Sequence, residues 1–114
     1  MADRLEELDP TLWSTTRQAA AIRSGALTSV GLTEAVLARI ESLNPVVNAV
    51  VTSDFGAALE QAAAADQRLA AGHEVGPLHG VPITVKDAIE TAGMKSTGGA
   101  PELANHVPAT DAPV

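Results

Sequence analysis

The chain has 114 residues, a net charge of −7 and no cysteine, which excludes disulfides, thiolate nucleophiles and cysteine metal sites. Hydrophobic residues make up 46% of the chain and aromatic residues only 2%, which is typical of a globular protein whose small side chains bury little apolar area each. The sequence has no basic stripe of the kind that binds nucleic acid, and no apolar stretch approaches the roughly 20 residues of a membrane span.

The opening of the chain, "MADRLEELDP", predicts a polar lead-in over residues 1–10. It is too charged to begin a signal peptide, so we expect a cytoplasmic protein. A first helix follows, because Thr15 and Gln18 have the spacing of a capping box. We expect it to end near Ser24, where Gly25 can take the left-handed conformation that closes a helix.

A second helix is predicted to begin at Thr28 or Ser29 and to end at the Asn44-Pro45 pair, since proline lacks the backbone N–H that the helical ladder needs. Apolar residues at helical spacing form one face of it: Val36, Leu37, Ile40 and Leu43. An alanine-rich helix is predicted from Phe55 to Ala71, with Gly72 terminating it and an apolar stripe at Phe55, Leu59, Ala62 and Leu69.

Short β-branched runs predict strands at residues 48–54 ("NAVVTSD") and 80–85 ("GVPITV"). The order helix, helix, strand, helix, strand predicts an α/β fold. Two strands do not make a stable sheet alone, so we expect the chain to be part of a larger domain.

Lys86 ends the second predicted strand, at the end of a sheet where α/β proteins place their sites. If that end is covered, the ammonium loses water and the neutral amine, which can act as a base, is favoured. The alternative is an ordinary solvated lysine on the surface.

The string "GPLHGVPITVKDAIETAGMKSTGG", residues 76–99, resembles the stretch around the catalytic lysine of the amidase signature family. That stretch reads G-P-L-x-G-[VI]-P-x-x-V-K-D-x-I-x-T-x-G-x-x-[ST]-T. The resemblance implies a mixed β-sheet core flanked by helices, with residues 1–114 forming the amino-terminal part of a single amidase domain. It also implies a serine, cis-serine, lysine triad in which Lys86 is the base, and no cofactor.

In the family pattern both serines of that triad lie in a region that would follow position 114 of this chain, and Ser96 matches neither of them. We therefore expect this chain alone to be inactive. The resemblance implies a small-molecule amide as substrate and no direct binding of nucleic acid or membrane, and it allows a homodimer of the complete enzyme. Thr97 is a candidate substrate-binding residue by its position only.

Other polar residues near Lys86 have simpler interpretations. Asp87 is predicted to anchor a loop through backbone amides, and His79 to be a packed or solvated histidine. His73 and His106 lack metal-ligand spacing, so no metal site is expected. The glycine-rich turns at Gly93, Gly98 and Gly99 are interpreted as tight turns rather than an anion cradle.

Two other functions stay open. The glutaminase subunit of a transfer-RNA amidotransferase shares the lysine motif, so the motif does not separate it from a stand-alone amidase. A non-catalytic truncated product that only binds or associates is the third possibility.

Overall fold

We describe a computed structural model that covers residue 4 and residues 7–114. The predicted lead-in at residues 1–3 and 5–6 lies outside these residues. The described chain divides into two compact units. The helical unit comprises the chain up to Val46 together with Asp54–Pro82, and the loop unit comprises Val47–Ser53 together with Ile83–Val114.

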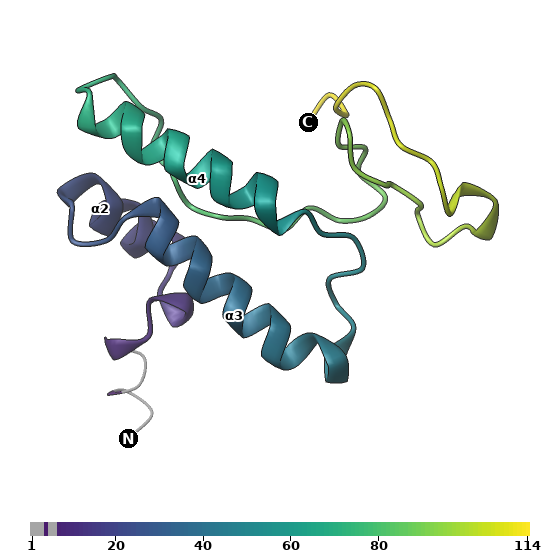
Figure 1. The fold of residues 1–114 in the computed structure, drawn as a ribbon, viewed down its shortest axis with the longest axis horizontal. Helices are drawn as coiled ribbons and strands as arrows, with labels where there is room; N and C mark the ends of the chain where they lie inside the picture. Colours follow the sequence, from purple (N-terminus) through teal and green to yellow (C-terminus); the bar gives the residue numbers. More distant parts are fainter. Residues whose placement is uncertain (1–3, 5–6) are drawn as a thin grey trace. The chain divides into compact units, whose positions relative to one another are not determined.

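The predicted α/β fold is wrong for this chain. Residues 7–114 contain helices, turns and irregular segments but no strand, and Figure 1 accordingly shows no arrow. Residues 48–54 and 80–85 have no neighbouring strand to pair with, and a pair of short strands is not stable in isolation. The β-branched side chains of the second run stay in water, with Ile83 77% and Val85 48% exposed.

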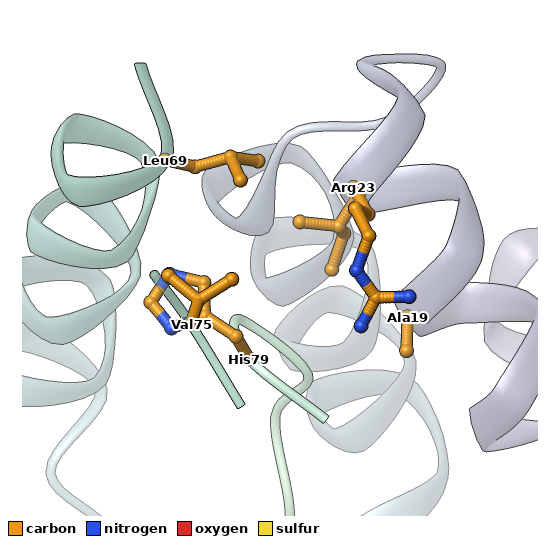
Figure 2. Close-up of a pocket in the computed structure, with 6 residues that line it drawn as sticks. Ala19, Arg23, Leu69, Val75 and His79 are labelled. Carbon is orange, nitrogen blue, oxygen red and sulfur yellow. The ribbon is translucent and has the colours of Figure 1, made fainter. Parts of the chain in front are cut away.

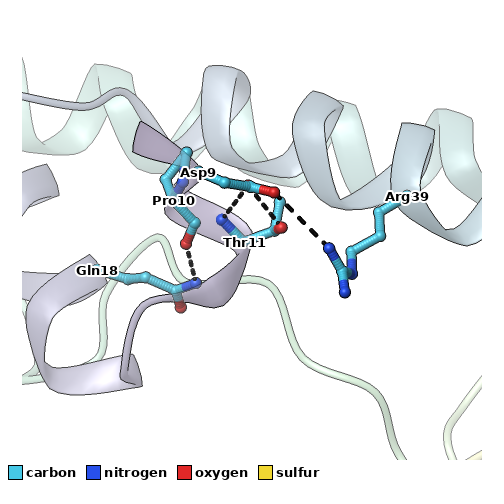
Figure 3. A network of polar contacts seen from close by, with 5 residues as sticks. All are labelled: Asp9, Pro10, Thr11, Gln18 and Arg39. Atoms are coloured by element: carbon cyan, nitrogen blue, oxygen red, sulfur yellow. Dashed lines mark hydrogen bonds and ion pairs between the residues drawn. The ribbon is translucent and has the colours of Figure 1, made fainter. Parts of the chain in front are cut away.

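The amino-terminal part of the helical unit is held by a polar network (Figure 3). Asp9 caps the short 3-10 helix η1 (Pro10–Leu12), accepting hydrogen bonds from the Thr11 N–H at 2.9 Å and the Thr11 hydroxyl at 2.7 Å. These bonds lower the pKa of Asp9, with a smaller contribution from Arg39, whose guanidinium lies 3.7 Å away. The buried Gln18 donates to the Pro10 carbonyl at 2.8 Å.

Helix α2 (Thr15–Ser24) follows the prediction, except at its cap. Ser14, not Thr15, is the N-cap, and its hydroxyl accepts from the Arg17 N–H at 3.2 Å. Gln18 is not a capping-box partner, because its amide bonds to η1 instead. Gly25 takes the left-handed conformation with φ +81°, as predicted.

Helix α3 (Ser29–Val47) begins where predicted but passes through Pro45. The predicted stop is wrong: the helix continues two residues past Pro45, whose fixed φ is compatible with a helix although it has no N–H to donate to the carbonyl four residues before it. The helix ends at Val47, and the next residue, Asn48, takes φ +47°. Asn is one of the few residues other than glycine that adopt this conformation readily.

The first turn of α3 is capped from two places. The Thr28 hydroxyl accepts from the Gly31 N–H at 2.9 Å. The carboxylate of Asp66, a residue of the helix over residues 55–70, accepts from the N–H groups of Ser29 and Val30, at 2.7 and 3.0 Å. A carboxylate here also complements the positive end of the helix dipole, so Asp66 fixes its own helix against the start of α3.

Helix α4 (Phe55–Ala70) is capped by Asp54, whose carboxylate accepts from the Ala57 N–H at 2.9 Å. The predicted helix from Phe55 is confirmed, with its end one residue earlier, and Gly72 follows with φ +76°. Figure 1 shows α4 running back alongside α3, which agrees with the Asp66 contacts. Among the described residues, the buried apolar side chains are two alanines and two larger aliphatic residues: Ala19, Ile22, Leu32 and Ala62.

The loop unit is held by backbone hydrogen bonds between two distant segments and contains the 3-10 helix η2 (Pro101–Leu103). The N–H groups of Gly93 and Ser96 donate to the carbonyls of Pro108 and His106, both at 3.0 Å. The Asp111 carboxylate adds a bond from the Ala92 N–H at 2.8 Å. These contacts order a segment without regular secondary structure.

Candidate functional site

Lys86, the candidate base, lies at the start of a tight turn in the loop unit. Its carbonyl accepts from the Ile89 N–H at 2.8 Å. The side chain is exposed, and its amine has no hydrogen bond or ion pair with any part of the chain that the structure describes. Nothing within these residues removes the amine from water, so the chain fixes the backbone of Lys86 and leaves its amine accessible.

Asp87, the next residue, anchors a neighbouring turn, as predicted. Its carboxylate accepts from the Thr97 N–H at 3.1 Å and from the Thr97 hydroxyl. The Thr97 hydroxyl is the main cause that lowers the pKa of Asp87 below its ordinary value of about 3.9, followed by the Thr97 N–H and by the backbone N–H groups of Gly98 and Gly99. The carboxylate is therefore a structural acceptor that stays ionised.

The turn that Asp87 holds runs from Thr97 to Ala100. The Ala100 N–H donates to the Thr97 carbonyl at 3.0 Å, and the two central residues, Gly98 and Gly99, have φ +58° and +76°. Positive φ at both central positions is the pattern of a type I′ turn, which glycine adopts without strain. The interpretation of these glycines as a tight turn is confirmed.

An open groove of about 360 Å³ lies in the loop unit beside this turn. Thr97 borders it, as do Gly99 and Lys95; Lys86 does not line it. The Thr97 hydroxyl donates to Asp87 and accepts from the Gly99 N–H at 3.2 Å. The full lining is Val51, Thr52, Lys95, Thr97, Gly99, Ala100, Pro101 and Ala104.

The segment that leads toward Lys86, residues 77–80, is clamped to the helices of its unit. The Arg23 guanidinium donates to the Pro77 carbonyl at 3.1 Å, and the Ser29 hydroxyl donates to the Gly80 carbonyl at 2.6 Å. His79 lies 2.8 Å from the Ala65 carbonyl through Nε2, which therefore carries the proton. The interpretation of His79 as a packed histidine is confirmed.

Figure 2 shows His79 facing Ala19, Arg23, Leu69 and Val75. The space among these side chains leaves no room for a water molecule, so this is packing and not a binding cavity. Gly80 lies at the tightest point of the clamp. A Cβ built there would lie 3.2 Å from Ile22 Cγ2 and from Ser29 Cβ.

Sequence reasoning missed Ser29 and Gly80 as residues that hold this segment, and Asp66 as the residue that caps the start of α3. Their roles depend on contacts between residues more than 35 positions apart, which local patterns do not encode. The one available signal was an acidic residue inside the alanine-rich stretch "QAAAADQRLA".

No group of three or more metal-ligating side chains is present within residue 4 and residues 7–114. His106 pairs instead with Glu90 at 2.8 Å. In the same described residues, none of the helices has the length and apolar character that crossing a bilayer requires.

Comparison with known proteins identifies the family of this chain. The sequence profile of the Amidase family matches residues 31–114, which include the clamped segment, Lys86 and the Asp87-bound turn. The chain therefore belongs to the Amidase family.

Among curated relatives, an indoleacetamide hydrolase from Bradyrhizobium diazoefficiens is 45% identical over 102 residues. A glutamyl-tRNA(Gln) amidotransferase subunit from Alkalilimnicola ehrlichii is 51% identical over 96 residues, and its counterpart from a Roseiflexus species is 47% identical over 92 residues. These alignments cover 90%, 84% and 81% of this chain. They cover only 20%, 20% and 19% of the relatives, so the chain spans about a fifth of their length.

Proposed function

We propose that residues 1–114 form the amino-terminal part of an amidase domain that hydrolyses a small carboxamide to an acid and ammonia. Lys86 is the base in this proposal. The observation that carries it is the position of Lys86 in "GVPITVKD", inside the region that matches the Amidase family.

The chemistry assigned to Lys86 is proton transfer. Its neutral amine accepts a proton from a bridging serine, which in turn takes the proton of a second serine as that oxygen attacks the amide carbonyl. The C–N bond then breaks, the leaving nitrogen regains the proton, and water hydrolyses the acyl-serine. Both serines are supplied from outside these 114 residues, so the chain alone is expected to be inactive.

This role requires that the amine of Lys86 be covered. It is exposed in this chain, and desolvation is what favours a neutral amine. The covering surface has to come from chain outside residues 1–114, which the much greater length of the relatives supports.

The substrate is proposed to be a small-molecule amide, with Thr97 at the border of its groove. No cofactor and no direct binding of nucleic acid or membrane enters this proposal. The complete enzyme is proposed to act in the cytoplasm and to form a homodimer.

The glutaminase subunit of a transfer-RNA amidotransferase is the second candidate. It is favoured by the 51% identity to the Alkalilimnicola amidotransferase protein, which is higher than the 45% identity to the indoleacetamide hydrolase. Both candidates assign Lys86 the same role. They differ in whether ammonia is released or passed to a partner, and specificity of the complete protein for glutamine over other carboxamides would favour the amidotransferase.

The test uses the complete protein with Lys86→Ala and Lys86→Arg, assayed for ammonia release from a panel of carboxamides that includes glutamine. Arginine keeps the charge and most of the length but does not give up its proton. We expect both variants to lose at least about a hundred-fold in kcat, the typical worth of general-base catalysis, with unchanged folding by circular dichroism. Near-normal turnover in Lys86→Arg would show that the lysine is structural.

The third possibility, a non-catalytic truncated product, predicts a different result. The gene would then end after codon 114, and only a folded chain without hydrolase activity would be found.

A further inference from the structure

Asp87 connects the turn that begins at Lys86 to the turn that borders the groove. Its carboxylate takes both the N–H and the hydroxyl of Thr97. We propose that Asp87 is a positioning residue that holds the Thr97–Ala100 turn as one wall of the substrate groove, so that Asp87 governs substrate affinity and not proton transfer. The inference rests on the proposed amidase function for its kinetic readout only.

The Thr97 hydroxyl already has partners within the loop unit. Its proton is donated to Asp87, and one lone pair accepts from the Gly99 N–H. The hydroxyl has no proton left to donate to a substrate. Thr97 therefore affects a ligand through the position of its backbone and methyl group, which the Asp87 contact sets.

Consecutive N–H groups in a turn with positive φ can form a concave anion site. Here the Thr97 N–H already donates to the Asp87 carboxylate, and the Gly99 N–H donates to the Thr97 hydroxyl. The turn therefore offers no run of consecutive free N–H groups for a second carboxylate, which suits a neutral carboxamide at this wall of the groove better than an anion.

The residues on either side of the turn have their own support: the Ser96 N–H donates to the His106 carbonyl at 3.0 Å, and Ala100 is the N-cap of η2. Between them, Gly98 and Gly99 are exposed, with no atom within 4 Å of an added Cβ. The Ala100 N–H bond to Thr97 closes the turn internally but does not fix it in place. The charge-assisted contact with Asp87 is the polar link that ties Thr97 to another segment, and bonds of this kind are about twice as strong as neutral ones.

The test measures kcat and KM of the complete protein with Asp87→Ala, Thr97→Val and the double variant. Each single variant is expected to raise KM about ten-fold or more, the worth of one hydrogen bond to a charged group, with kcat within about three-fold. The double variant is expected to be no worse than the more severe single one, because both remove the same contact. In a Thr97→Ser background, which keeps the hydroxyl, Asp87→Ala is still expected to raise KM.

Asp111→Ala is the matched control, since it removes another carboxylate that accepts a backbone N–H in the same unit, that of Ala92 at 2.8 Å, away from the groove lining. It is expected to leave KM unchanged. A loss of kcat at constant KM in Asp87→Ala would overturn the proposal and assign Asp87 to the chemical step. Additive effects of Asp87→Ala and Thr97→Val would overturn it as well.

A second readout does not depend on activity. Amide hydrogen exchange of a peptide spanning residues 95–103 is expected to be at least about ten-fold faster in Asp87→Ala and unchanged in Asp111→Ala. If exchange rises but no carboxamide is hydrolysed by the unmodified protein, the proposed function fails and the positioning contact stands. If exchange is unchanged, the positioning role fails whatever the activity.

Discussion

Gly80 is the position where the clamp on residues 77–80 is most sensitive to a single atom. Its φ of +83° lies in the left-handed region, and an added Cβ would lie 3.2 Å from both Ile22 Cγ2 and Ser29 Cβ. Neither neighbour has room to move, because Ile22 and Ser29 are each 1% exposed. The Ser29 hydroxyl is also committed to the Gly80 carbonyl at 2.6 Å.

The cost of Gly80→Ala follows from these two features. A non-glycine residue in the left-handed region costs about 1–2 kcal/mol, and an extra carbon in a filled site costs about 1–3 kcal/mol. The sum, about 2–5 kcal/mol, is a large fraction of the stability of an ordinary domain. It corresponds to at least about a thirty-fold increase in local opening.

The measurement is amide hydrogen exchange of peptides spanning Gln18–Thr33 in the complete protein, where Ile22 and Ser29 lie. Gly76→Ala is the control, because Gly76 belongs to the same connecting segment but has no positive φ and no atom within 4 Å of the added Cβ. We expect faster exchange in Gly80→Ala only. Equal protection in the two variants would refute the reasoning that the Gly80 contact fixes this segment.

Three further predictions follow from the same contacts. Asp66→Ala leaves the N–H groups of Ser29 and Val30 without their acceptor and is expected to lower the free energy of unfolding in urea by about 1–3 kcal/mol. Glu60→Ala, at an exposed position of the same helix, is expected to lower it by less than about 0.5 kcal/mol, and equal losses would contradict the capping role. The pKa of Asp87 is lowered in the folded chain, so its contribution to stability is complete above the unfolded pKa of about 3.9 and is lost as the pH falls through the folded pKa. NMR is therefore expected to show the Thr97 amide signal shifting only below about pH 4. A shift centred near neutral pH would assign the change to another group. The isolated 114-residue chain is expected to bind a hydrophobic dye and to lack a sharp melting transition, because large apolar side chains of its loop unit are exposed: Val47, Val51, Ile83, Val85, Leu103 and Val107. A cooperative two-state melt without dye binding would contradict this.

The helices were predictable because their signals are local. The apolar stripe, the glycine at the end of α2 and the proposed start of α3 all lie within a few residues of the features that they determine. The errors are also local in origin. Ser14 and Thr15 are both good caps, and Pro45 removes one bond of the helical ladder without ending α3, which runs to Val47.

The two predicted strands are absent from residues 7–114, because a strand forms only by pairing with another strand. The β-branched run at residues 80–85 describes a segment suited to a buried strand, and no residue of the run says which chain provides the cover. The same limit applies to the site. Asp87 was recognised as a loop anchor, but its partner Thr97 and the role of Asp66 come from contacts that only the folded chain reveals.

The segment that carries the resemblance, residues 76–99, contains two anchored residues, Gly80 and Asp87, with an exposed apolar stretch between them. Within the helical unit, Gly80 is held by Ile22 and Ser29; within the loop unit, Asp87 is held by Thr97. Between these two residues, Ile83 and Val85 are exposed to water, which costs about 25 cal/mol per Å² of apolar surface left exposed. An apolar segment of this kind is suited to being covered, and the role proposed for Lys86 also requires that its amine be covered. A Lys86 that reacts with an amine reagent as fast in the complete protein as in this chain would count against that role.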